Sequence, residues 1–247
     1  MNAPKSLSSS EYPHEINRNK GDPAESFGMM IIEATPLISR GRDYDAGFHL
    51  RSCMARFIVF EGIDGSGKSS VAKAVASRLE REKAVLTEEP TKTWLGEAVR
   101  RSHAEKTDPF TEAFLFLADR ATHTEAIRKW LADGKTVVCD RYFHSTVAYQ
   151  GAALEGKVDY DPFDWLLDAN LKISLQPDIV FLFKVDPEIA LQRVNARGSL
   201  SKFEKLDFLR KVASNYDKFP KMFKNIVVID SNGPLDSVIA DVMRRLE

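Results

Sequence analysis

The clearest chemical signal in the chain is a glycine-rich segment, FIVFEGIDGSGKSS, at residues 57–70. It fits the pattern G-x-x-x-x-G-K-[ST], in which glycines let the backbone wrap around phosphate oxygens and the following helix directs N–H groups at the polyanion. Lys68 would add a full positive charge, and the Ser69 hydroxyl would coordinate Mg²⁺. An ordinary glycine-rich turn is the alternative, but the apolar run before the segment and the helical pattern after it favour a phosphate site. The residues expected to hold a nucleoside triphosphate are Gly62, Ile63, Asp64, Gly65, Ser66, Gly67, Lys68, Ser69 and Ser70.

A second candidate group is the pair Asp140 and Arg141, which directly follows the apolar run TVVC. Ligands of open α/β sheets bind beyond the carboxyl ends of the strands, so both side chains should emerge beside the glycine-rich segment. Asp140 could hold the water shell of Mg²⁺, and the planar guanidinium of Arg141 could bind a phosphate through two hydrogen bonds. An acid next to a base is more often a surface ion pair, and only the neighbouring segment favours the functional interpretation.

These residues must be positioned by a framework in which short apolar runs alternate with amphipathic helical patterns. The runs suited to strands are FIVF (57–60), AVLT (84–87), TVVC (136–139), DIVFLF (178–183) and NIVVID (225–230). Asp108-Pro109 and Asp186-Pro187 are start signals for two of the helices, and Gly134 is placed to end the first of them. We therefore predict an α/β fold of the three-layer P-loop NTPase class, with a five-stranded parallel sheet and helices on both faces.

The composition is that of an ordinary globular enzyme. The 247 residues are 43% hydrophobic, and 35 basic against 36 acidic residues leave a net charge of −1, which gives no general attraction to nucleic acid or to a membrane surface. The two cysteines, Cys53 and Cys139, lack the spacing of metal ligands. Because no apolar stretch approaches the roughly 18 residues of a membrane span, we expect a cytoplasmic protein.

The first 53 residues differ from the rest of the chain. They mix Ser, Pro, Gly and both charges, with little apolar periodicity. We predict a poorly ordered extension at 1–53 followed by one domain at 54–247. Met54 directly precedes the first apolar run, so a shorter product beginning there would retain the whole domain.

Several motifs together resemble a known family. In order along residues 54–247 they are FEGIDGSGKSS, TEEPTKTWLGEAVR, FLFLADRATHTEAI, CDRYFHSTVAYQGA and ALQRVNARGSLSKFEKLDFLRKVASNY. The set resembles the thymidylate kinases, and DRY-x-x-S-x-x-AYQG after a strand is specific within the nucleoside monophosphate kinases. The resemblance implies transfer of the γ-phosphoryl group of ATP to dTMP, giving dTDP, with Mg²⁺ as cofactor. It also implies a homodimer.

The resemblance further implies an acceptor site. Phe116 and Arg120 lie four residues apart on a helical pattern, and would stack on thymine and hydrogen-bond its carbonyl edge. Thr146 and Gln150 would help to recognise that edge, while Tyr149 would disfavour a ribose 2′-hydroxyl. Without the resemblance, an aromatic of the core with a snorkelling arginine is the better interpretation of the first pair. The residues implied to contact dTMP are Asp64, Glu89, Pro90, Arg100, Phe116, Arg120, Arg141, Thr146, Tyr149 and Gln150.

Phosphoryl transfer also needs cations near the transferred group. In one branch of the resembled family an arginine within the glycine-rich segment supplies this charge, but here Gly65 and Ser66 supply none. A short lid, QRVNARGSLSKFE, would then provide it through Arg193, Arg197 and Lys202, with Arg197 as the leading candidate. Charged lid residues are also commonly just solvated. The implied catalytic set is Lys68, Arg141, Arg197, Asp64 and Arg193.

Two other functions stay open at this point. The chain could be a P-loop kinase of another nucleoside monophosphate or of a nucleoside, which the set Phe116, Arg120, Thr146 and Gln150 argues against. It could also be a nucleotide-binding module without a productive acceptor site. Intact ATP binding without turnover of any acceptor would favour that module.

Overall fold

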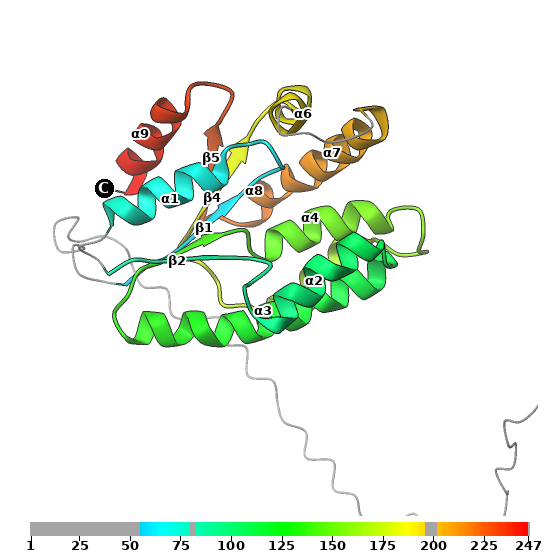
Figure 1. Ribbon diagram of the computed structural model, residues 1–247, viewed down its shortest axis with the longest axis horizontal. Coiled ribbons are helices and arrows are strands. Elements are labelled where there is room, and N and C mark those ends of the chain that lie inside the picture. The colour runs from blue at the N-terminus through cyan, green and yellow to red at the C-terminus, as the bar shows by residue number, and fades with distance from the viewer. Residues whose placement is uncertain (1–54, 80–82, 196–201, 247) are drawn as a thin grey trace, which may run out of the picture. The chain divides into compact units, whose positions relative to one another are not determined.

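The computed structural model describes residues 55–79, 83–195 and 202–246 (Figure 1). Five strands form one parallel sheet in the order β2-β3-β1-β4-β5. Their bounds are β1 Phe57–Glu61, β2 Val85–Glu88, β3 Val137–Asp140, β4 Ile179–Lys184 and β5 Ile226–Asp230. Each predicted strand is confirmed to within a residue or two at its ends. The predicted extension at 1–53 and Met54 lie outside the described residues, so the domain boundary stays a prediction.

Helices cover both faces of the sheet. They are α1 Lys68–Arg78, α2 Trp94–Glu105, α3 Pro109–Ala132, α4 Phe143–Leu154, α5 Pro162–Ile173, α6 Pro187–Asn195, α7 Lys202–Tyr216, α8 Phe219–Met222 and α9 Leu235–Leu246. In Figure 1, α1 and α9 lie on one side of the sheet and α3 and α4 on the other. Among the described residues, no helix is both long and apolar enough to cross a membrane.

The central strand β1 shows why the two layers form. Its residues alternate between the faces, so Phe57 and Val59 pack with α4 and α5, whereas Ile58 and Phe60 pack with α1 and α9. All five residues of β1 are buried, as expected for a parallel strand covered on both sides. Burial of such a run stabilises the fold by about 25 cal/mol per Å² of apolar surface.

The start and stop signals in the sequence act as expected. Asp108 accepts hydrogen bonds from the backbone N–H groups of Phe110 and Thr111 and so caps α3, which runs unbroken for 24 residues. Gly134 lies just past the end of α3 with a φ of 73°. Because α3 is this long, it carries side chains from the sheet edge to the region beyond the strand ends.

Candidate active site

The glycine-rich loop between β1 and α1 lies directly against the backbone of neighbouring elements. Gly62 and Gly65 have φ values of 143° and 85°, in the region that side chains rarely adopt. A Cβ atom on Gly65 would lie 2.3 Å from the carbonyl oxygen of Ala190 in α6. One on Gly62 would lie 2.6 Å from the carbonyl oxygen of Phe183 in β4. Glycine is therefore required at both positions, which explains the spacing of the motif.

Lys68 is the first residue of α1 and only 5% of it is exposed. Burial lowers the pKa of its ammonium group to about 8, and the nearby Arg141 contributes, although Asp64 acts in the opposite direction. Its Nζ atom lies 4.0 Å from Oδ1 of Asp64, at the outer limit of an ion pair. A buried cation whose counter-ion is this distant attracts any polyanion that reaches the loop.

A cavity of about 700 Å³ opens beside the loop. It is lined by Asp64, Gly65, Ser66, Gly67, Lys68, Ser69, Ser70, Val71, Lys73, Arg193, Ser231, Gly233, Leu235 and Val238. Gly62 and Ile63 instead line a neighbouring cavity of about 580 Å³ between β4 and α7. The larger cavity has the loop at one end and the turn after β5 at the other, which suits an elongated phosphorylated ligand.

Arg193 closes one wall of this larger cavity. Its guanidinium donates hydrogen bonds of 3.0 Å to the carbonyl oxygens of Ser231 and Asn232, and a longer one of 3.4 Å to that of Gly65. These bonds tie the turn after β5 to the glycine-rich loop. The predicted catalytic Arg193 is thus already engaged with backbone oxygens.

Ser69 and Asp140, the two predicted metal ligands, face a common space. Both line a cavity of about 570 Å³ next to β2 and α3. Oδ1 of Asp140 is buried and has no hydrogen-bond partner among the described residues. No cluster of three or more His, Cys, Asp or Glu side chains in the described parts of the chain could hold a metal alone. A cation here would take its other ligands from nucleotide and water, as Mg²⁺ commonly does.

Arg141, Asp64 and Tyr149 form a charged cluster between β3 and α4 and the glycine-rich loop. Nη2 of Arg141 lies 2.6 Å from Oδ1 of Asp64, and Nη1 donates to Oγ of Ser145 at 3.0 Å. The Tyr149 hydroxyl donates to Oδ2 of Asp64 at 3.0 Å, and its ring lies under the guanidinium at 5.0 Å. Burial alone would raise the pKa of Asp64, but Arg141 and Lys68 outweigh it and hold that pKa below its usual value. The carboxylate therefore stays charged at neutral pH.

A further cavity of about 250 Å³ lies on the other side of this cluster. It is lined by Asp64, Glu89, Pro90, His103, Phe116, Arg120, Arg141, Tyr142, Ser145, Tyr149 and Gln150. The structure thus brings together most of the residues that the resemblance implies for dTMP. Asp64 also lines the 700 Å³ cavity, so this single carboxylate faces both spaces. Arg100 and Thr146 are the two implied residues that do not line the smaller cavity.

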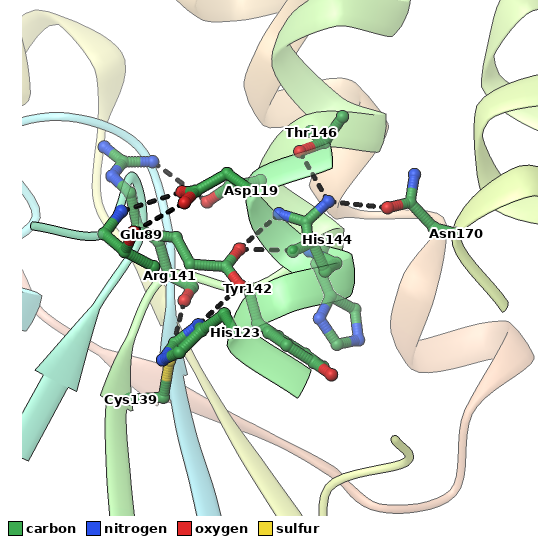
Figure 2. Close-up of polar contacts among 12 residues, drawn as sticks. Glu89, Asp119, His123, Cys139, Arg141, Tyr142, His144, Thr146 and Asn170 are labelled. Atoms are coloured by element: carbon green, nitrogen blue, oxygen red, sulfur yellow. Dashed lines mark hydrogen bonds and ion pairs between the residues drawn. The ribbon is translucent and has the colours of Figure 1, made fainter. Parts of the chain in front are cut away.

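Thr146 is hydrogen-bonded to Arg120 instead, and Figure 2 shows it on the same side as Asn170. It is fully buried and accepts a 2.9 Å hydrogen bond from Nη1 of Arg120, which also donates to Asn170 at 2.6 Å. Nε of Arg120 donates to Oε2 of Glu89 at 3.0 Å, and Nη2 contacts the same oxygen. These contacts use four of the five N–H groups of Arg120, and one N–H on Nη2 has no partner among the described residues. Arg120 also lines the smaller cavity, so this N–H could bind a ligand there.

Glu89 has a second partner in this network. Its Oε1 atom lies 2.8 Å from Nδ1 of His123, whose Nε2 lies 2.8 Å from the hydroxyl of Thr87 in β2. Neither His123 nor Asn170 was predicted from the sequence. His123 lies within the motif FLFLADRATHTEAI, but nothing in its spacing there singles it out, and Asn170 lies outside all of the quoted motifs. Only the fold shows that they contact Glu89 and Arg120.

Arg100 fixes the loop after β2 rather than reaching the cavity. Its Nη1 and Nη2 atoms donate 2.7 Å hydrogen bonds to the carbonyl oxygens of Thr91 and Pro90. Asp119 of α3 accepts from the backbone N–H of Thr91 at 2.8 Å (Figure 2). The loop that presents Glu89 is therefore held from two helices.

Glu61, at the end of β1, is a further residue that the sequence analysis missed. It is completely buried and accepts hydrogen bonds from the backbone of Tyr142 at 2.7 Å, from Ser145 Oγ at 2.6 Å and from the Tyr216 hydroxyl at 2.9 Å. Burial raises its pKa, but His144, Ser145 and Arg141 outweigh the effect and lower it overall. Glu61 holds the start of α4, and with it Arg141, in place. Its position directly after the strand run was the only available signal.

Arg197, the leading lid candidate, lies outside the described residues. The same holds for the side chain of Lys202. Their predicted roles therefore stay predictions.

One protein family and several relatives match most of this chain. The sequence model of one protein family, described as thymidylate kinase, matches residues 60–242. A probable thymidylate kinase of Methanococcoides burtonii is 39% identical over 196 residues, covering 77% of this chain and 96% of that protein. One of Methanosarcina acetivorans is 40% identical over 199 residues, covering 77% and 95% respectively. One of Pyrococcus horikoshii is 37% identical over 198 residues, covering 76% and 93%.

Proposed function

The chain belongs to the thymidylate kinase family, and from that membership we propose how its residues divide the work of moving a phosphoryl group from ATP to dTMP. The reaction is that of the family, a phosphotransfer that gives dTDP. No covalent intermediate on the protein is needed, because the acceptor phosphate attacks in line and the protein positions and neutralises the reacting groups. The division of roles rests on one observation, that Asp64 lines both the 700 Å³ and the 250 Å³ cavities.

ATP is the occupant of the larger cavity. The glycine-rich loop at residues 62–70 and the N-terminus of α1 would surround its β- and γ-phosphates, with Lys68 as the buried cation. The nucleoside would extend past Arg193 toward the turn after β5, where Ser231 and Gly233 line the cavity.

Mg²⁺ is the cofactor that this arrangement favours. Ser69 and Asp140 would hold it, because they line the same space and Asp140 has an unpartnered buried oxygen. When bound, Mg²⁺ neutralises charge on the β- and γ-phosphates. The protein's own contribution is to keep the Asp140 carboxylate at the end of β3, beside the loop.

dTMP is the occupant of the smaller cavity. Phe116 offers a ring face to the base, and the remaining N–H of Arg120 offers a donor to a carbonyl oxygen of thymine. Arg141 lies between the cavities with its guanidinium held by Asp64 and Ser145, a position from which it can contact the acceptor phosphate. Tyr149, packed under Arg141, would crowd a ribose 2′-hydroxyl.

The catalytic cations in this proposal are Lys68, Arg141 and Arg197. The first two are held beside the cavities, and Arg197 is proposed from the sequence alone. An arginine that acts on the transition state contributes about 10³-fold or more in rate, so Arg197→Ala should lower kcat by that order while the KM for ATP changes little. Near-normal turnover of Arg197→Ala would contradict its role. The homodimer and the cytoplasmic location also stay proposals.

A direct assay tests the assignment. ADP release from ATP and Mg²⁺ is measured with dTMP, dUMP, UMP, CMP, AMP and GMP as acceptors. We expect dTMP to have the highest kcat/KM. A preference for any other acceptor, or ATP binding without turnover of any of them, would overturn the proposed function.

A further inference from the structure

Glu112, on the first turn of α3, connects two residues of the smaller cavity without lining it. Its Oε2 atom accepts a 3.0 Å hydrogen bond from Nε2 of Gln150, and its Oε1 atom pairs with Nδ1 of His103. Gln150 and His103 both line the cavity. We propose that Glu112 is a positioning residue for base selection, which fixes the side-chain amide of Gln150 so that its oxygen faces the base.

Glu112 and the Gln150 amide differ in what each can donate or accept. A carboxylate only accepts hydrogen bonds, so Glu112 can pair with the nitrogen end of the Gln150 amide and not with its oxygen end. The opposite end of that amide, Oε1, receives no hydrogen bond from any described residue. Gln150 is only 4% exposed, so the amide cannot exchange its orientation for contacts with bulk water.

His103 keeps Glu112 in the required state. The Nδ1 contact from His103 and the hydrogen bond from Gln150 hold the pKa of Glu112 below its usual value, against the effect of burial, so the side chain stays an acceptor. The His103 ring also packs edge-on against Phe116, with their centroids 5.8 Å apart. His103 therefore contacts both Phe116, which would set the plane of the base, and Glu112, which orients the Gln150 amide at the edge of the base.

This inference rests on the proposed function, since it concerns how the same cavity chooses dTMP. Thymine carries a donor at N3–H between two carbonyl oxygens, whereas cytosine carries an acceptor at N3 and an amino group at C4. An amide oxygen at that edge pairs with thymine and faces the lone pair of cytosine. The free N–H of Arg120 adds a second preference for a carbonyl at C4. Glu112 acts through Gln150, so Glu112→Gln should relax the first preference and leave the second.

The test uses a pair of ligands that differ only at this edge. The dissociation constants of dTMP and of 5-methyl-dCMP, which keeps the methyl group, are measured by calorimetry for wild-type protein, Glu112→Gln and Glu112→Ala. A glutamine at 112 can accept or donate, and an alanine can do neither, so both free the Gln150 amide to turn. We expect the preference for dTMP over 5-methyl-dCMP to fall about tenfold in both variants, the size of one unpaired hydrogen-bonding group.

Glu125→Gln is the matched control, because Glu125 is an exposed acid on the same helix, paired only at the surface with Arg128. It should keep the wild-type preference. If Glu112→Gln and Glu112→Ala weaken both ligands equally, so that the ratio is unchanged, Glu112 has only a structural role and the inference fails. A wild-type protein that binds and phosphorylates dTMP no better than the other nucleotides would overturn the proposed function instead.

Discussion

The two cavities differ in how closely the charged side chains around them are paired with other groups of the protein. At the larger one, Lys68 lies 4.0 Å from its carboxylate partner, and in the 570 Å³ cavity that shares Ser69 with it, Asp140 has an oxygen without a partner among the described residues. Around the smaller one, Arg120 and Arg141 are each held by several hydrogen bonds before any ligand binds. We call these regions the donor half and the acceptor half.

This difference indicates how each half contributes to the stability of the fold. Without ligand, the donor half contains charged groups that lack close partners, and a bound nucleotide with its cation would supply those partners. The acceptor half must hold a planar donor in a fixed orientation for a small base, and it does so with a buried network that also contributes to the fold. Substitutions in the donor half should therefore cost mainly activity, and those in the acceptor half should also cost stability.

The largest effect is expected for Glu89→Gln in the acceptor half. The change leaves the guanidinium of Arg120 buried without its counter-ion, and removing one partner of a buried pair typically costs about 3–5 kcal/mol. Urea denaturation should show this as a lower free energy of unfolding. The neighbouring Glu88, whose partner Lys92 is 87% exposed, is the matched control, and Glu88→Gln should cost less than about 1 kcal/mol. Equal stabilities for the two variants would remove the contrast between the halves.

Lys68→Met should come next, with the opposite signature. Loss of a preorganised charge at the transferring group typically lowers kcat by about 10²–10³-fold. Because the ammonium group is buried with a distant partner, the free energy of unfolding should not fall. Lys129→Met, at an exposed position of α3, should change neither quantity appreciably. A marked loss of stability in Lys68→Met would show that the Lys68 ammonium group already forms a stabilising ion pair in the ligand-free protein.

A third comparison concerns backbone rather than charge. Gly65→Ala and Gly67→Ala both place a side chain at a left-handed φ, near 85°, which costs about 1–2 kcal/mol. The Gly65 Cβ would also meet the Ala190 carbonyl oxygen at 2.3 Å, whereas nothing lies within 4 Å of the Gly67 position. Thermal unfolding should therefore show the larger loss for Gly65→Ala. The reverse order would mean that α6 can move away from residue 65 at little cost and does not fix the conformation of the loop.

The smallest effect is a pH dependence of the kcat/KM for ATP, which should arise from Lys68 in the donor half. Lys68 is cationic below its pKa of about 8 and loses its proton as the pH rises through that value. The kcat/KM for ATP should fall roughly tenfold per pH unit above it, because this parameter reports the free enzyme. Bound phosphates favour the charged ammonium, so kcat should stay level to higher pH. In the acceptor half burial raises the pKa of Tyr149 to about 12, beyond this range. A kcat that falls in parallel with kcat/KM would contradict the assignment to free Lys68.

The glycine-rich loop of the donor half could be predicted from sequence because it is local. One motif, one strand before it and one helix after it fix the loop, and Asp140 follows from the rule that sites lie beyond strand ends. The acceptor half is assembled from α2, α3, α4 and the loop after β2, so its partners are far apart along the chain. The spacing of Phe116 and Arg120 was visible, but Asn170 and His123 could not be paired with them without the fold. Thr146 was expected at the base edge, and in the structure it is hydrogen-bonded to Arg120 instead.

The parallel sheet also has a consequence for how the chain is made. The central strand β1 pairs Phe57 with Val137 of β3 and Ile58 with Ile179 of β4, separations of 80 and 121 residues. At a synthesis rate of roughly 5–20 residues per second, β1 is made about 4 s or more before β3 and about 6 s or more before β4. Until both have been made, the four apolar residues of β1 lack a neighbouring strand on at least one side. We expect the domain to fold slowly, and only after β4 has been synthesised. Until then β1 is the segment of the nascent chain that would most need a chaperone.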